Sequence, residues 1–337
     1  MSVLEAQVHI GLETEYSVAV TPNVSLEVEN DNISAEREDL ESIGMRAGLV
    51  GLREDRQRSI VQGASGTLEV PMLTRGLEAL LAAAVGYYEF DGSGDRNKHT
   101  FIADPLGSDR SFTAVVGRPD VNGNVTTWTY PGGRVVSWKL SQAVGEVGKL
   151  ECETNFANET FSDATAMPTP AYPEGAQMVV WGDSSVQYRV QGADDWVSLD
   201  TKQFELSVDN ALDVERRFLR NSTWKKKPVR AGLIVAEGSL ECEFDTTTLY
   251  NLIHNNTVCE LRSVWETPLP AGGTATITVE FGGIVFRGET PNVSLDSLPE
   301  QSVSFKGLDA GQVYPTALGP MPGMLRVTIE NDAPAVA

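Results

Sequence analysis

The stretch Gly-Thr-Leu-Glu-Val-Pro-Met-Leu-Thr-Arg-Gly-Leu-Glu-Ala-Leu-Leu occupies residues 66–81 and has a second copy in the chain. Residues 238–253 read Gly-Ser-Leu-Glu-Cys-Glu-Phe-Asp-Thr-Thr-Thr-Leu-Tyr-Asn-Leu-Ile and align with the first stretch without a gap. In both copies an alternating apolar and polar run is followed by apolar residues at spacings of three and four. Alternation is typical of a half-buried strand, and the wider spacing places side chains on one face of a helix. Each copy therefore predicts a strand followed by an amphipathic helix.

A threonine stands before each predicted helix. Thr74 precedes the first, and Thr246 or Thr247 precedes the second. A threonine hydroxyl can accept a hydrogen bond from a free backbone N–H at the start of a helix. These residues are therefore the predicted N-caps.

Further matches around the two copies indicate an internal duplication. Leu-Glu-Val-Glu-Asn at residues 26–30 matches Leu-Ser-Val-Asp-Asn at 206–210, and Arg-Ala-Gly recurs at 46–48 and 230–232. Any strand followed by an amphipathic helix gives a single match of this kind, but matches in the same order favour duplication. We therefore expect a mainly β fold with two tandem β-sandwich or barrel domains, each with one flanking α-helix.

Changes in composition along the chain place the predicted boundaries. A Pro-rich segment, residues 161–177, is the predicted linker between the two domains. The first domain is assigned to residues 1–160 with a charged arm at 37–63. The second is assigned to 178–312 with a basic arm at 216–230, followed by a C-terminal strand and tail at 313–337.

The charge of the protein bounds its possible partners. The chain has 337 residues, with 47 Asp plus Glu against 26 Lys plus Arg, and a formal net charge of −21. This excess argues against a protein that binds nucleic acid by neutralising phosphates. It is compatible with a protein past which DNA moves without being held.

No sequence motif of an enzyme or metal protein is present. The three histidines are scattered, the three cysteines lack Cys-x-x-Cys spacing, and no nucleotide-binding or hydrolase motif occurs. We therefore predict no catalytic residue, cofactor or metal site. The N-terminal sequence has no signal-peptide pattern and no apolar run is long enough for a membrane span, which favours synthesis in a cytoplasm without membrane association.

The two charged arms are candidates for contacts between subunits. Neither arm has the apolar periodicity of a core element, and a long structureless stretch inside a domain is uncommon unless it binds something. The alternative is a solvated charged loop. The candidate inter-subunit cations are Arg46, Arg53, Arg56, Arg216, Arg217, Lys225, Lys226, Lys227 and Arg230.

Acidic residues recur on alternating positions of several predicted strands. They belong either to ordinary solvated faces or to one acidic surface shared by several strands. The candidates for such a surface are Glu27, Glu29, Glu69, Glu151, Glu153, Glu241 and Glu243.

The chain resembles the major tail tube proteins of long, non-contractile-tailed bacteriophages over most of its length. The similarity is carried by Gly-Leu-Glu-Thr-Glu-Tyr at residues 11–16, by both copies of the repeated stretch, and by Thr-Pro-Asn-Val-Ser at 290–294. The run Lys-Lys-Lys at 225–227 is not part of this resemblance.

The resemblance implies a structural virion protein that forms stacked rings around a conduit for double-stranded DNA, which passes without specific binding. Its further implied partners are the tape-measure, tail terminator and tip proteins, and its place is the virion tail. Related tubes are commonly six-fold, so two domains per chain predict three chains per ring, with six chains as the alternative. The acids above are then candidates to face the lumen. A secreted or surface β-sandwich adhesin is the second hypothesis, against which the missing signal sequence and cysteine framework weigh.

Overall fold

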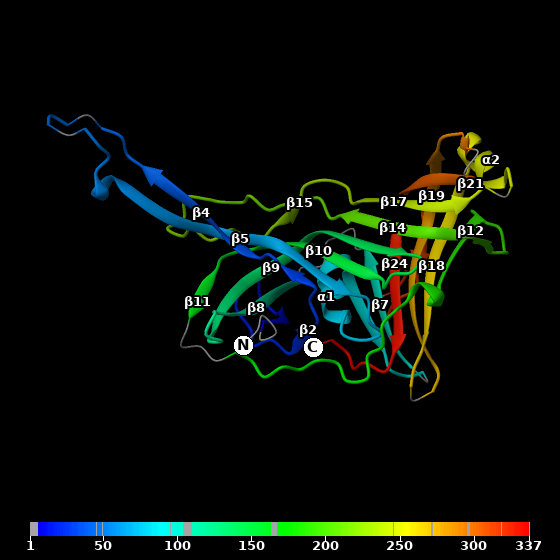
Figure 1. Ribbon diagram of the computed structural model, residues 1–337, viewed down its shortest axis with the longest axis horizontal. Coiled ribbons are helices and arrows are strands. Elements are labelled where there is room, and N and C mark those ends of the chain that lie inside the picture. The colour runs from blue at the N-terminus through cyan, green and yellow to red at the C-terminus, as the bar shows by residue number, and fades with distance from the viewer. Residues whose placement is uncertain are drawn as a thin grey trace.

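The computed structural model describes residues 6–44, 46–48, 50–94, 96–103, 110–162, 167–244, 246–270, 272–290, 292–294, 297–317 and 319–336. Strands dominate it, and two α-helices are present in these residues (Figure 1). The first half contains β1 (Gln7–Glu13), β2 (Val24–Leu26), β3 (Asn30–Asp31), β4 (Ser34–Glu41), the 3-10 helix η2 (Glu54–Arg56), β5 (Gln57–Pro71), α1 (Glu78–Val85), β6 (Gly86–Asp91), β7 (Asn97–Ala103), β8 (Ser111–Pro119), β9 (Val125–Ala143), β10 (Lys149–Phe156) and β11 (Thr160–Ser162).

The second half has a similar order of elements. It contains the 3-10 helix η3 (Trp181–Asp183), β12 (Ser184–Val190), β13 (Val197–Leu199), β14 (Thr201–Asp209), β15 (Leu212–Asp213), β16 (Val229–Arg230), β17 (Val235–Glu243), α2 (Thr248–His254), β18 (Val258–Pro268), β19 (Thr274–Gly288), β20 (Asn292–Ser294), β21 (Ser297–Gly307), β22 (Val313–Tyr314), β23 (Met321–Pro322) and β24 (Leu325–Asn331).

One antiparallel sheet, here called the long sheet, runs through both halves. Its strands follow the order β3 and β4, β5, β10, β9, β14, β17, β21, and then β20 with the end of β19. The halves meet where β9 pairs with β14, with Leu140 opposite Leu206. Because strand side chains alternate between faces, one face of this sheet is apolar and buried while the other is polar.

A second layer covers the buried face of the long sheet. In this layer β24 pairs with β7 of the first half and with β19 of the second, so the C-terminal strand also joins the halves. Aromatic side chains fill the space between layers, including the buried Trp138, Trp265 and Phe305. The sheets do not close into a barrel, which confirms the predicted mainly β sandwich fold.

The two helices differ in their surroundings. All eight residues of α1 are buried, whereas in α2 only Leu249 is buried. The first helix therefore lies inside the sandwich and does not expose the polar face expected of an amphipathic flanking helix. Its sequence, Glu-Ala-Leu-Leu-Ala-Ala-Ala-Val, is apolar on nearly every side, as a buried helix requires.

The predicted threonine cap is wrong for α1, while for α2 one of the two threonines offered accepts a backbone hydrogen bond. No side chain caps α1, and Thr74 instead accepts a hydrogen bond from the backbone N–H of Gln177 at the end of the predicted linker. Thr247 stands at the N-cap position of α2 without a capping bond from its own hydroxyl, but the hydroxyl of Thr246 accepts a hydrogen bond from the backbone N–H of Thr248, the first residue of α2, at 3.5 Å.

The repeated stretch occupies equivalent positions in the two halves. β5 leads to α1 and β10 returns to pair with β5, as β17 leads to α2 and β21 returns to pair with β17. The upstream match is different, because Leu26 lies in β2 against β1 whereas Leu206 lies in β14 against β17. A Leu-x-Val pattern fits any half-buried strand, so that match did not mark equivalent positions. The division into two tube domains remains a prediction.

Candidate assembly surfaces

The polar face of the long sheet is a continuous surface across both halves. One row of directly opposed residues runs from Glu69 through Glu151, Lys139, Ser207 and Glu237, and it ends at β21. The acids on this face are Glu69, Glu151, Glu153, Glu205, Asp209, Glu237, Glu241, Glu243 and Glu300. Serines and threonines fill most of the remaining positions, so the face is polar and predominantly negative.

The lysines on this face are all held by carboxylates. The ion pairs, by N···O distance, are Lys139 with Glu205 at 2.9 Å, Lys149 with Glu29 at 2.6 Å and Glu69 at 3.1 Å, Lys202 with Glu300 at 2.5 Å, and Lys306 with Glu237 at 2.7 Å. The hydrogen bonds that Lys149 donates to Glu29 and Glu69 raise the pKa of Lys149. Each lysine therefore links neighbouring segments and has its charge offset by a carboxylate on the same face.

Six of the seven acids proposed from sequence meet on this surface. Glu29 reaches it through Lys149, and Glu69, Glu151, Glu153, Glu241 and Glu243 lie directly on its strands. Glu27 does not join them, because it lines a small cavity with Arg75 and Pro173 instead. Sequence reasoning missed Glu205, Asp209, Glu237 and Glu300, although the same alternation in β14, β17 and β21 could have indicated them.

The first arm is a β-hairpin that projects from one end of the long sheet (Figure 1). β4 pairs with the first part of β5 from Ser34 opposite Ser65 to Glu41 opposite Gln57. The expectation of a stretch without structure of its own is therefore wrong. The outer part of the hairpin lacks alternating apolar residues because both of its faces meet solvent, whereas Gly63 and Ala64 at its base are buried. Arg46, Arg53 and Arg56 lie at its tip, near the exposed apolar side chains Leu40, Ile43, Val50 and Leu52.

The second arm lies along the base of the first, and Lys225 fixes it there. The Lys225 side chain is fully buried, with its Nζ 2.8 Å from a carboxylate oxygen of Glu36 and 3.3 Å from Oδ1 of Asn155. Its backbone N–H donates to the carbonyl of Ala157. Arg217 donates to the same Glu36 carboxylate at 2.9 Å. The lysine expected on the surface therefore makes its contacts within the chain.

The other cations of the second arm mostly shape the loop itself. Arg216 donates to the carbonyl of Lys227 at 2.6 Å, and Arg230 donates to the carbonyl of Asn210 at 3.3 Å. Lys226 is exposed, with its ammonium 5.6 Å from the centre of the Phe218 ring. The part of this arm that is free to contact another molecule is therefore narrower than its sequence suggested.

Within the described ranges no three His, Cys, Asp or Glu side chains gather in a way that could hold a metal ion. None of the helices in the same residues combines the length and apolar character that a transmembrane helix requires.

Comparison with known families identifies the chain. The family of phage tail tube proteins matches residues 4–307, which is nearly the whole sequence. The chain therefore belongs to this family of structural proteins of the virion tail. No curated protein is similar enough to count as a match.

Proposed function

We propose that the protein forms the tail tube of a long, non-contractile-tailed bacteriophage, with three chains in each ring and rings stacked into a conduit for the genome. The observation that carries this proposal is the junction between the halves, where β14 pairs with the edge of β9. The chain contains, in this junction, one example of the contact that could join it to the next copy.

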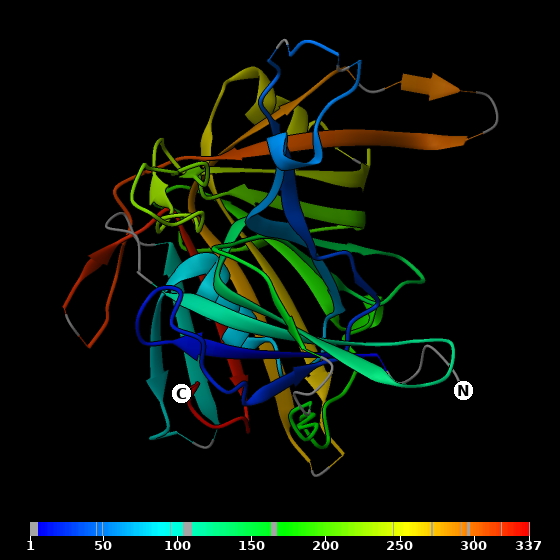
Figure 2. The same cartoon turned by 90° about the vertical axis from the view of Figure 1, so that its left-hand side faces the viewer.

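The strand pairings at the two ends of the long sheet match the two sides of the junction between the halves, so one end could pair with the other end of a second copy. At one end β3 and β4 pair with β5, as β14 pairs with β17. At the other end β20 and the end of β19 pair with β21, as β9 pairs with β10 (Figure 2, orange). The part of β19 that follows Val285 is not paired with β18. This edge of β19 therefore lacks a partner among the described residues. Unpaired edges favour strand addition, and a head-to-tail contact of this kind closes into a ring.

In such a ring the polar face of the long sheet lines the lumen. Its acids repel phosphates and its lysines are offset by carboxylates. Together with Lys306, Arg287 on the same face lies near enough to Glu237 to lower the pKa of that carboxyl. DNA would therefore pass without being held. The tape-measure protein would occupy the same lumen before the genome, and terminator and tip proteins would bind the ends of the tube. The chain would be made in the cytoplasm of the bacterial host.

Counting the chains per ring tests the assembly. Native mass measurement of purified rings, with averaged electron micrographs viewed along the axis, should give three chains and six similar lobes. Six chains per ring would refute the trimer, and a protein that stays monomeric under all conditions would refute ring closure through the sheet edges.

Charge reversal tests the lumen assignment. Glu151, Glu153 and Glu241 form no ion pair with a described residue, so changing all three to lysine leaves the existing pairs intact. Phage carrying these changes should assemble tails but release DNA at least about tenfold more slowly, because each passing phosphate meets unpaired cations. Glu27→Lys, away from this face, is the matched control. Normal release by the triple variant would place the face outside the conduit.

A further inference from the structure

The buried ammonium group of Lys225 lies between a carboxylate and a side-chain amide. Its Nζ is 2.8 Å from a carboxylate oxygen of Glu36 and 3.3 Å from Oδ1 of Asn155. Glu36 comes from β4 and Asn155 from β10, the two strands that pair with β5 on either side (Figure 1). An amine, an amide carbonyl and a carboxyl group therefore meet in one place. They can serve as nucleophile, acyl group and proton carrier.

The surrounding chain holds these groups in a closed site. The Lys225 side chain is fully buried, and Asn155 is only 5% exposed. A Cβ atom added to Gly63 would lie 2.6 Å from Cε of Lys225, so the missing side chain at Gly63 leaves room for the lysine stem. The backbone N–H of Lys225 donates to the carbonyl of Ala157 at 3.2 Å. The lysine is therefore fixed both at its backbone and at its Nζ.

The amine lies close to the carbon atom that it could attack. Because a C=O bond is about 1.23 Å long, Nζ is no more than about 4.5 Å from Cγ of Asn155. Reacting atoms in a productive arrangement are about 3–3.5 Å apart, so a small movement of the amide is sufficient. Positioning of this kind can replace an effective concentration of about 10⁵ M or more.

The protonation of the pair sets the pace of such a reaction. Burial lowers the pKa of Lys225, against the opposing effect of Glu36. Burial on its own raises the pKa of Glu36, but the hydrogen bond and charge of Lys225 lower it overall. The ion pair therefore predominates, and the neutral amine that can attack is a minor state. The reaction is accordingly slow, and freshly purified protein retains the ion pair.

We propose that Lys225 and Asn155 join in an isopeptide bond, with Glu36 carrying the protons. The Lys225 ammonium gives one proton to Glu36, and the freed lone pair of Nζ forms a bond to Cγ of Asn155. Glu36 passes its proton to Nδ2 and takes a second one from Nζ, while the bond between Cγ and Nδ2 breaks. Nδ2 leaves as ammonia, which takes the last proton from Glu36. One ammonium and one primary amide thus become one secondary amide and one ammonium ion, with no other reactant.

The bond ties the second arm covalently to β10, at the base of the first arm. It closes a loop between residues 70 positions apart, which stabilises the fold chiefly by restricting the unfolded chain. The Glu36 side chain is 30% exposed, so the ammonia can leave on that side. All three residues belong to one chain, so the reaction does not depend on ring formation.

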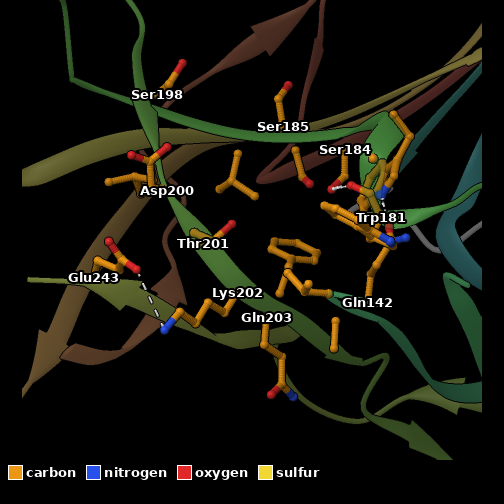
Figure 3. Close-up of a pocket in the computed structure, with 18 residues that line it drawn as sticks. Gln142, Trp181, Ser184, Ser185, Ser198, Asp200, Thr201, Lys202, Gln203 and Glu243 are labelled. Carbon is orange, nitrogen blue, oxygen red and sulfur yellow. Dashed lines mark hydrogen bonds and ion pairs between the residues drawn. The ribbon is translucent and has the colours of Figure 1, made fainter. Parts of the chain in front are cut away.

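Lys202 offers a comparison within the same chain. It lines a groove of about 390 Å³ beside Trp181, where β9 ends and β14 begins (Figure 3). Its Nζ lies 2.5 Å from a carboxylate oxygen of Glu300 and 3.8 Å from one of Glu243. Its side chain is 42% exposed, and no side-chain amide of a described residue accepts a hydrogen bond from it. Lys202 therefore has carboxylates but neither burial nor an acyl group, and it should stay unmodified.

Mass spectrometry tests the bond directly. Purified protein incubated for several days at neutral pH and then denatured should have lost the mass of one ammonia molecule. Trypsin should release a branched peptide in which residues 150–189 are joined to residues 221–226, because a linked Lys225 blocks cleavage after it. This peptide separates the cross-link from ammonia loss by cyclisation at Asn122–Gly123. Wild-type protein that gives no branched peptide overturns the inference.

Substitutions assign the roles of the individual groups. Lys225→Arg keeps a positive charge but removes the amine, and should abolish the loss of ammonia. Glu36→Gln cannot carry protons, and should slow the formation of the branched peptide at least about 100-fold. Lys202→Arg and Lys226→Arg are the matched controls and should react like the wild type, with circular dichroism showing that every variant is folded. A wild-type rate in Glu36→Gln would refute the proton-carrying role, and loss of the bond in either control would refute the assignment to Lys225.

Discussion

The two copies of the repeated stretch end in helices that meet opposite environments. α1 packs against β1, β6, β7 and β9, and the C-terminal segment closes over it. The side-chain amide of Asn331 donates to the Thr74 carbonyl at 2.7 Å and to Glu78 at 2.6 Å. α2 packs mainly against β19 and otherwise faces solvent. The repeated sequence pattern therefore determined that a helix forms in both places. The burial of each helix depended instead on how many layers the rest of the chain adds around it.

The two arms also differ in exposure, as the two helices do. The first extends from the body as a hairpin with solvent on both faces, and the second is a loop attached to the base of the first by Lys225. Both lie at the same end of the long sheet, where the first is formed by β4 and the start of β5 and the second follows β14. The two arms therefore differ in their roles, one projecting and one supporting.

The largest effect is expected from truncating the equivalent leucines of the two helices. Leu80 of α1 is fully buried, so Leu80→Ala should lower the free energy of unfolding by about 2–5 kcal/mol through lost contacts and a cavity. Leu252 of α2 is only partly buried, and Leu252→Ala should cost less than about 1.5 kcal/mol. Urea denaturation of both variants measures the difference. Equal losses would mean that the helices are equally enclosed in solution.

A smaller difference should separate two adjacent lysines of the second arm. Lys225→Ala removes a buried ammonium and leaves Glu36 and Asn155 without their partner, at a cost of about 1–3 kcal/mol, reduced by the access of water to Glu36. The matched change Lys226→Ala, at an exposed position, should alter stability by no more than about 0.5 kcal/mol.

Limited proteolysis measures the difference between the Lys225→Ala and Lys226→Ala variants within the second arm itself. Cleavage within residues 216–230 should accelerate in the Lys225→Ala variant, because the loop loses its attachment to the first arm. It should stay unchanged in Lys226→Ala. Similar behaviour of the two variants would show that Lys225 does not hold the arm.

The sequence supported the fold class and much of the acidic surface because both depend on local alternation. Leu68 and Leu240 are buried while Glu69 and Glu241 point outward, as period-two patterning requires. The apolar composition of α1 also carried a signal, since Ala82, Ala83 and Ala84 offer no polar face. Reading only its leucine spacing led to the incorrect expectation of an amphipathic helix.

Features set by contacts distant in sequence could not be predicted in this way. Nothing in Lys-Lys-Lys distinguishes the first lysine, whose burial depends on Glu36, 189 residues away. The pairing of β24 with β7, and that of β14 with β9, likewise depends on which edges the packed layers leave open. The groove beside Trp181 has no sequence pattern because it forms where several strands end.

The smallest effect concerns the pH dependence of the contact between the arms. Burial on its own raises the pKa of Glu36, but the hydrogen bond and charge of Lys225, aided by Ser65 and Arg217, outweigh it and lower the pKa. A carboxyl group whose pKa is lower in the folded state stabilises the fold above its unfolded pKa of about 4.3, and this stabilisation disappears as the pH falls through the folded pKa. The stability difference between wild type and Glu36→Gln should therefore be largest near neutral pH and shrink below about pH 4. The Lys225→Ala background is the control, because Glu36→Gln made there should show a weaker dependence on pH. A difference that stays constant from pH 7 to pH 3 would mean that the ionised Glu36 carboxylate contributes nothing to holding the second arm against the first.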